Sequence, residues 1–174
     1  AVLLGRLSDI VDYLLYIDKK TGMPNREKLN IYIGEMAGKV LPEAFTCFTL
    51  NLDNLSELTK RFGYTVGDGV LKDFAGLVQL MGDTEGMRGY NGVGRFVVFF
   101  EECSSKKAAA MIRILDNQVE EYNSLNPEYP IRYTAAWATT EETDTYEIRE
   151  LLRLSQKKWK QMEKEKKDKA EEET

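Results

Sequence analysis

Two aspartates and an arginine lie where the chain could do chemistry. Residues 44–52 are rich in β-branched and aromatic side chains, which predicts a strand with Asn51 and Asp53 at its C-terminal end. Asp68 precedes an amphipathic stretch, and Arg95 follows a glycine-rich turn. An arginine at such a place can bind a phosphate directly, without a metal ion, or it can form an ion pair with Asp53 or Asp68. Of these two roles we favour the pairing.

Most of these polar positions also have a purely structural interpretation. Asp53 can be a loop residue, and Asp68 can cap the helix that follows it. Gly92 and Gly94 can be turn residues only, because an Asn-Gly hairpin needs positive φ angles whatever its chemistry. We favour the structural interpretation for all four.

Composition narrows the class of protein. The 174 residues suffice for one domain with a single core, and 43% apolar and 30% charged residues are typical of a globular protein. The formal net charge is -5, and lysines gather only near the C-terminus, where glutamates are interleaved with them. Binding to nucleic acid is therefore not expected.

Residue types that the chain lacks exclude several chemistries. There is no histidine, and the two cysteines, Cys47 and Cys103, have no CxxC spacing. Zinc sites and Ser-His or Cys-His catalysis are thereby excluded. No apolar run approaches the roughly 20 residues that cross a bilayer. We expect a cytoplasmic location, including the cytosolic part of a membrane-anchored sensor, with no membrane contact by this fragment.

Hydrophobic periodicity predicts an α+β domain with a mixed central β-sheet flanked by helices. Asn91-Gly92 is typical of a hairpin turn, Pro24 of a helix start, and Asp144 with Glu147 of a capping box. The expected helices are 3–15, 24–38, 67–81, 108–122 and 148–162, and the expected strands are 44–52, 87–91, 96–101 and 131–139.

Several segments, taken together, resemble the GGDEF family of diguanylate cyclases. Residues 18–26 resemble its DxLTGLxNR signature, and residues 51–55 with 62–71 resemble its DxDxFKxxND…GHxxGDxxL block. Residues 92–96, Gly-Val-Gly-Arg-Phe, occupy the place of GGDEF itself. Residues 131–137 and the helix around Trp159 match the end of the family pattern. The resemblance implies a nucleotide-cyclase-like fold with a ferredoxin-like βαββαβ core.

The resemblance also implies an activity and shows where this chain departs from it. The family makes cyclic di-GMP from two GTP molecules held between two antiparallel domains, with Mg²⁺ bound by the first Asp of DxD and the acidic pair of GGDEF. In this chain those positions are Asn51, Gly94 and Arg95. A glycine has no side chain to offer, and an arginine brings a fixed positive charge. We therefore expect no catalytic residue, no metal ligand and no cofactor; Mg²⁺ would be required only if the domain were active.

The nucleotide contacts implied by the family are also altered. Ser56 replaces the phosphate-side lysine, Thr59 the guanine-reading asparagine, and Met162 the first of two basic residues in the late helix, of which Lys166 is the second. Asp68 matches the second guanine contact. The product-inhibition motif would fall on Asp83 and Gly86 and is absent. The remaining candidates for nucleotide binding are Asp53, Thr59, Asp68, Arg95 and Lys166.

These expectations give one favoured function and two alternatives. The favoured one is a catalytically inactive GGDEF-type domain that serves as a regulatory, dimerisation or protein-interaction module of a bacterial sensor protein. Its partners would be another protein, attached signalling domains or a second copy in a homodimer. The alternatives are a receptor that binds GTP or another guanine nucleotide weakly, and an active diguanylate cyclase.

The resemblance divides the chain into three parts. Residues 1–17 are expected to form an N-terminal linker helix, residues 18–167 the GGDEF-like domain, and residues 168–174 a polar tail to which we assign no function. The apolar stripe of the linker helix can pack within the chain or form the end of a dimeric signalling coil. It covers only about two heptads, too few to establish a coiled coil.

Overall fold

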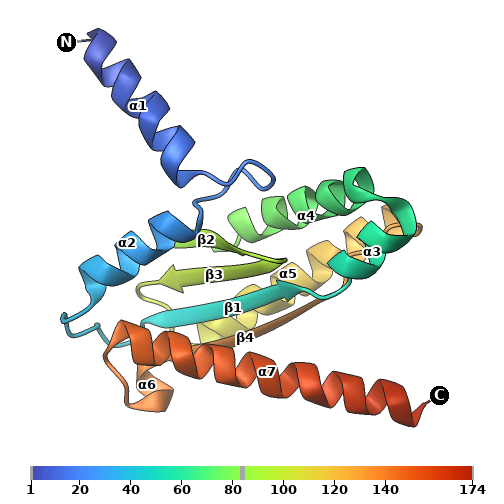
Figure 1. Cartoon of the computed structure of the whole chain (residues 1–174). Helices are drawn as coiled ribbons and strands as arrows, with labels where there is room; N and C mark the ends of the chain where they lie inside the picture. The colour runs from blue at the N-terminus through green and yellow to red at the C-terminus, as the bar shows by residue number, and fades with distance from the viewer. Residues whose placement is uncertain (1, 83–84, 174) are drawn as a thin grey trace.

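The sheet has four strands in the order β2-β3-β1-β4, and every neighbouring pair is antiparallel. The computed structural model describes residues 2–82 and 85–173. In Figure 1 the strands form one twisted layer between helices. This is the ferredoxin-like βαββαβ arrangement, so the α+β prediction is confirmed. The strands are β1 (Thr46–Leu52), β2 (Gly86–Gly92), β3 (Arg95–Phe100) and β4 (Tyr133–Thr139).

Strand direction is where the sheet differs from the expected mixed one. The strands joined through helices, β1 with β2 and β3 with β4, do run parallel, but each pair is separated by another strand. Only antiparallel neighbours therefore exchange hydrogen bonds. In the described sheet, no two hydrogen-bonded neighbours are parallel, although the strands joined through a helix run in the same direction.

Helices cover both faces of the sheet. One face carries α4 and α5, and the other carries α2 and α7 (Figure 1). Alternation along β1 and β3 sends neighbouring side chains to opposite cores. Phe48 and Val98 enter the core beneath α4 and α5, whereas Cys47 and Val97 enter the one beneath α2 and α7. The helices are α1 (Val2–Tyr16), α2 (Arg26–Met36), α3 (Leu55–Phe62), α4 (Tyr64–Gln79), α5 (Ser105–Leu125), α6 (Thr140–Thr143) and α7 (Ile148–Glu172).

The capping residues of two helices differ from those expected. Helix α2 is capped by Asn25, whose side chain accepts a hydrogen bond from the Lys28 N–H, while Pro24 lies one residue earlier in a bridge with Ile17. The expected capping box at Asp144 is wrong. Asp144 has a φ of 49° and ends the short helix α6, which the sequence pattern did not predict. Glu147 itself caps α7.

The expected hairpin is present, but the Asn91-Gly92 pair is not at the centre of its turn. Gly92 pairs with Arg95, so the central turn residues are Val93 and Gly94, with φ angles of 54° and 77°. A bulge between Tyr90 and Gly92 leaves Asn91 outside the ladder. The Arg26 Nη2 donates to the Asn91 carbonyl at 2.6 Å and its Nε to the amide oxygen at 3.2 Å. Asn91, which the pattern assigned to the turn, therefore lies in the bulge.

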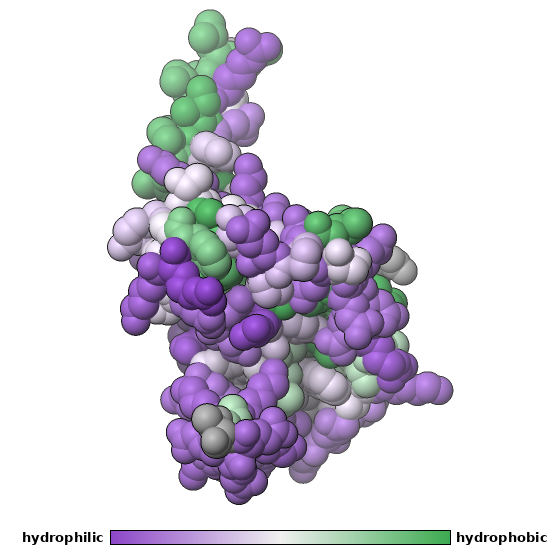
Figure 2. Space-filling model, turned by 90° about the vertical axis from the view of Figure 1, so that its right-hand side faces the viewer, coloured by the Kyte–Doolittle hydropathy of each residue, from purple (hydrophilic) through white to green (hydrophobic). Residues whose placement is uncertain are grey.

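Helix α1 stands apart from the rest of the molecule. Figure 1 shows it pointing away from the sheet, and none of its described residues is buried. Figure 2 shows apolar side chains along its length. Leu3, Leu7, Ile10 and Leu14 recur at alternating spacings of four and three and are all more than half exposed. No helix in the described part of the chain is long and apolar enough to cross a membrane.

Candidate functional site

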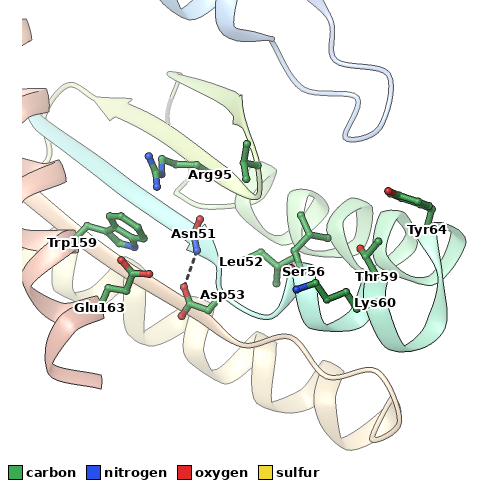
Figure 3. Close-up of a pocket in the computed structure, with 12 residues that line it drawn as sticks. Asn51, Leu52, Asp53, Ser56, Thr59, Lys60, Tyr64, Arg95, Trp159 and Glu163 are labelled. Carbon is green, nitrogen blue, oxygen red and sulfur yellow. Dashed lines mark hydrogen bonds between the residues drawn. The ribbon is translucent and has the colours of Figure 1, made fainter. Parts of the chain in front are cut away.

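A cavity of about 470 Å³ lies at the C-terminal end of β1 (Figure 3). Asn51 pairs with Arg95 across the β1–β3 ladder. Because Leu50 and Phe96 enter the core beneath α4 and α5, alternation turns Asn51 and Arg95 toward α7. The cavity is lined by Asn51, Leu52, Asp53, Leu55, Ser56, Thr59, Lys60, Tyr64, Val93, Arg95, Trp159 and Glu163.

Hydrogen bonds join the hairpin tip to the end of β1 and to a tyrosine of β2. The Gly94 carbonyl accepts from the Leu52 N–H at 2.8 Å, and the Gly94 N–H donates to the Tyr90 hydroxyl oxygen at 3.0 Å. Burial raises the pKa of Tyr90 above its ordinary value. A Cβ on Gly94 would lie 3.1 Å from the Leu52 carbonyl oxygen. The tip is therefore held close to the end of β1, and position 94 has backbone only there.

Asp53 is the carboxylate at the strand end, and both of its oxygens are engaged. Oδ1 accepts from the Asn51 side-chain amide at 2.8 Å, and Oδ2 accepts from the Thr134 hydroxyl at 2.6 Å. The Lys166 ammonium lies 3.9 Å from Oδ2 and donates to the Thr134 hydroxyl oxygen at 2.7 Å. Asp53 lies in the turn before α3, in agreement with its interpretation as a loop residue.

Arg95 stacks on an aromatic ring instead of pairing with an acid. Its guanidinium carbon lies 4.5 Å from the centre of the Trp159 ring, and its Nε is buried with no hydrogen-bond acceptor among the described residues. No carboxylate of residues 2–82 or 85–173 lies within 4.0 Å of this guanidinium. The expected pairing with Asp53 or Asp68 is therefore wrong, because Asp53 is already engaged and Asp68 lies elsewhere.

Asp68 is outside the cavity and is paired with a lysine. Lys20, in the loop after α1, places its ammonium 3.2 Å from the Asp68 carboxylate. The hydrogen bond to Asp68, and then its charge, raise the pKa of Lys20. Asp68 is not the expected helix cap either, since α4 begins at Tyr64 with Gly63 as its N-cap.

Thr59 lines the cavity from α3 but also packs between two helices. Its hydroxyl lies so close to Gly67 of α4 that a Cβ on this glycine would overlap it. Gly67 therefore permits the close approach of α3 and α4. Of the five expected nucleotide-binding residues, the cavity wall contains Asp53, Thr59 and Arg95, while Lys166 reaches it only through Asp53 and Thr134.

Sequence reasoning missed part of the cavity wall. Trp159, which the family pattern placed only in the late helix, is 4% exposed and lines the cavity. Glu163, one turn later on α7, pairs with Lys167 at 3.0 Å. Lys60 extends from α3 toward the strand end (Figure 3). The spacing of residues 159, 163 and 166, which share one helical face, was the signal that could have identified the α7 side of the site.

No group of three or more cysteine, aspartate or glutamate side chains that could hold a metal ion occurs within residues 2–82 and 85–173. The acidic side chains on the cavity wall are Asp53 and Glu163. The remaining oxygen donors there are the Asn51 amide and the hydroxyls of Ser56, Thr59 and Tyr64. The product-inhibition position Asp83 lies outside the described residues.

The fold and the strand-end cavity together define an α+β domain of the nucleotide-cyclase type. The family model described as "Diguanylate cyclase, GGDEF domain" matches residues 15–169. The chain therefore belongs to the GGDEF family, as its signatures predicted.

Solved structures support the same fold at low sequence identity. A diguanylate cyclase/phosphodiesterase from Caldicellulosiruptor saccharolyticus matches with a TM-score of 0.66 and 18% identity, over 87% of this chain and 91% of that one. The active GGEEF domain of a diguanylate cyclase from Vibrio cholerae matches with a TM-score of 0.63 and 19% identity, over 71% and 78%.

The c-di-GMP-bound S helix-GGDEF-EAL chain of LapD from Vibrio cholerae matches with a TM-score of 0.63 and 12% identity, over 79% of this chain. This chain spans only 32% of the LapD one. No curated protein matches the sequence. These comparisons establish the family and the fold, and place the chain among domains of cyclic di-GMP signalling.

Proposed function

We propose that this GGDEF domain is a non-catalytic signalling module, which keeps the cyclase scaffold and does not make cyclic di-GMP. One observation carries the proposal. At the place where the family pattern calls for an acidic pair, the hairpin presents the backbone of Gly94 and the Arg95 guanidinium stacked on Trp159. The positive charge thus stands where cations would have to bind.

The residues present do not fit a Mg²⁺ site. Transfer of a phosphoryl or nucleotidyl group needs hard cations held by anionic oxygens beside the triphosphate. Asp53 already shares its oxygens with Asn51, Thr134 and Lys166. An arginine about 4 Å from a cation would oppose it by about 4 kcal/mol per unit charge near a protein surface. We therefore derive no catalytic step through a metal ion.

The guanine side of the site is also altered. Asp68, the match to a family guanine contact, is engaged by Lys20, which stands at the leucine position of the DxLTG signature. A guanine base would have to displace this ion pair. The two ends of a bound GTP would thus both meet the chain's own cations in place of the expected acids.

Incubation with GTP and Mg²⁺, followed by chromatography for cyclic di-GMP, tests the proposal. We expect no product under conditions in which an active GGDEF domain, assayed in parallel, converts its substrate. The matched variant Asn51→Asp/Gly94→Asp/Arg95→Glu, which restores the family's acids, is expected to gain Mg²⁺ binding by calorimetry. Clear turnover by the unaltered chain would reject the proposal.

Helix α1 is the proposed connection to the rest of the signalling protein. Its apolar stripe lies open along the described helix, and fully burying one leucine or isoleucine stabilises a complex by about 1.5–3 kcal/mol. LapD carries an S helix before its GGDEF domain. We infer that α1 packs against α1 of a second copy.

Light scattering over a range of concentrations tests this pairing. The chain is expected to become dimeric as its concentration rises, and Leu7→Lys with Ile10→Lys is expected to keep it monomeric. Arg6→Lys, on the same helix, is the matched control and should dimerise normally. A chain that stays monomeric at every concentration would contradict the α1 pairing and leave the absence of catalysis unaffected.

A further inference from the structure

Within the part of the chain that the structure describes, the acidic side chains around the cavity have ion-pair partners, and the basic ones do not. Its two acids each have a lysine partner on α7: Asp53 has Lys166 at 3.9 Å, and Glu163 has Lys167 at 3.0 Å. Its cations are different. Neither Lys60 nor Arg95 has a carboxylate within 4.0 Å in the described part of the chain. The wall therefore offers positive charge that is not yet balanced.

The Arg95 guanidinium is held against an aromatic ring. Its Cζ atom lies over the Trp159 ring, 4.5 Å from the ring centre. A guanidinium held over a ring can still use its N–H groups for bidentate bonds to phosphate. The ring also restricts the rotamers of the arginine, which lowers the entropy that a ligand must overcome.

Two N–H groups at this stack lack acceptors. The Arg95 Nε and the Trp159 indole nitrogen are both buried without a hydrogen-bond partner among the described residues. Trp159 is 4% exposed, so water does not readily satisfy it. A buried donor without an acceptor costs about 1–3 kcal/mol. An anion in the cavity, with a small shift of the stack, would supply the missing acceptor.

We propose that the cavity binds the phosphate group of a small organic phosphate without a divalent cation. Arg95 and Lys60 are the charged contacts, and the Ser56 and Thr59 hydroxyls are additional donors. The cavity of about 470 Å³ is large enough for a metabolite of nucleotide size. The inference rests on the proposed loss of the cation site, because the arginine takes the place of the metal ligands.

Calorimetry on the intact chain in excess EDTA tests the proposal with three probes: pyrophosphate, GTP and guanosine. Pyrophosphate and GTP are expected to bind, guanosine is not, and replacing EDTA by Mg²⁺ should not tighten either complex. Binding that requires Mg²⁺ would overturn the proposal. So would binding of guanosine with no response to pyrophosphate, or no binding of any probe at millimolar concentration.

Two variants assign the contacts. Arg95→Gln and Lys60→Gln should each weaken pyrophosphate binding by about tenfold or more, the usual loss for a charge-assisted contact. Lys72→Gln is the matched control, because Lys72 is exposed on α4 and does not line the cavity. Lys60 is exposed, so its variant stays folded even if Arg95→Gln does not. Unchanged binding by Lys60→Gln together with any folded Arg95→Gln protein would sink the assignment.

The outcomes separate this inference from the proposed function. A chain that binds no phosphate and makes no cyclic di-GMP would still be a non-catalytic module, but its cavity would not be a phosphate site. A chain that makes cyclic di-GMP would reject the proposed function whatever its affinity for pyrophosphate in EDTA.

Discussion

Two places on the same pair of strands differ in what they require of the sequence. Phe48 faces Val98 in the middle of the β1–β3 pair, and Asn51 faces Arg95 at its end. The middle residues are fully buried and belong to one core, whereas the end residues line an open cavity. Only three positions separate the two pairs. The fold therefore depends on the middle of the strands, and their ends can change chemistry without disturbing it.

Removing a core aromatic should give the largest effect. Phe48→Ala takes away a ring that packs edge-on against Phe100 at 6.0 Å and leaves a cavity in the core. We expect the free energy of unfolding to fall by about 3–5 kcal/mol, measured in urea. Val93→Ala, at a residue that is 90% exposed on the hairpin tip, is the control and should change little. Equal losses for both would refute the distinction between middle and end.

A methyl group added to the sheet should have the next largest effect. A Cβ on Gly86 would lie 2.7 Å from the Phe99 carbonyl oxygen, which is backbone and cannot move aside. Gly86→Ala should therefore destabilise the protein by about 1–3 kcal/mol. Gly69→Ala in α4, where the Cβ meets open space, should instead stabilise it by about 0.5–1 kcal/mol. Urea unfolding of both variants measures the contrast, which disappears if β2 shifts to accommodate the methyl group.

Alkaline pH should weaken the packing of α2 on the sheet. Burial raises the pKa of Tyr32 to about 12, and its ring lies 5.3 Å from that of Phe99. An unfolded tyrosine ionises near pH 10, so the folded state retains the proton longer. The contribution is complete below about pH 10 and is lost as the pH rises to about 12. Between about pH 8 and about pH 11, the free energy of unfolding should fall less for Tyr32→Phe than for the unaltered chain.

Removing the charge at the strand end should have the smallest effect on stability. Arg95→Met keeps an aliphatic stem against Trp159 and removes both the cation–π contact and the buried Nε without an acceptor. A cation–π contact contributes about 0.5–2 kcal/mol, and the removal of a lone donor offsets part of it. We expect a net change of less than about 1 kcal/mol in urea. A loss as large as that of Phe48→Ala would show that Arg95 holds the sheet together.

Local patterns predicted most of the framework. The amphipathic stripe of residues 67–81 and the β-branched run of residues 44–52 became α4 and β1 because periodicity and burial agree there. Patterns failed where a distant contact decides. Arg26 holds the bulge at Asn91, 65 positions away in the chain, and Tyr90 donates its N–H to the Pro24 carbonyl across a similar separation. Neither contact is visible from local spacing.

The site was predictable in position but not in its pairings. The family signatures located Asn51, Gly94 and Arg95 correctly at one strand end. They did not predict that Lys20 would engage Asp68 or that Trp159 would lie beneath Arg95. Those contacts join residues 48 and 64 positions apart, as their numbers show, and depend on how α4 and α7 pack.

One side of helix α7 forms part of the site at the end of β1. Trp159, Glu163 and Lys166 all come from this helix, and each meets the strand end only because they share one of its sides. Turning α7 by a single residue, about 100°, would remove the ring under Arg95 and the ammonium beside Asp53 at the same moment. The rotational position of α7 therefore decides which side chains line the cavity at the end of β1.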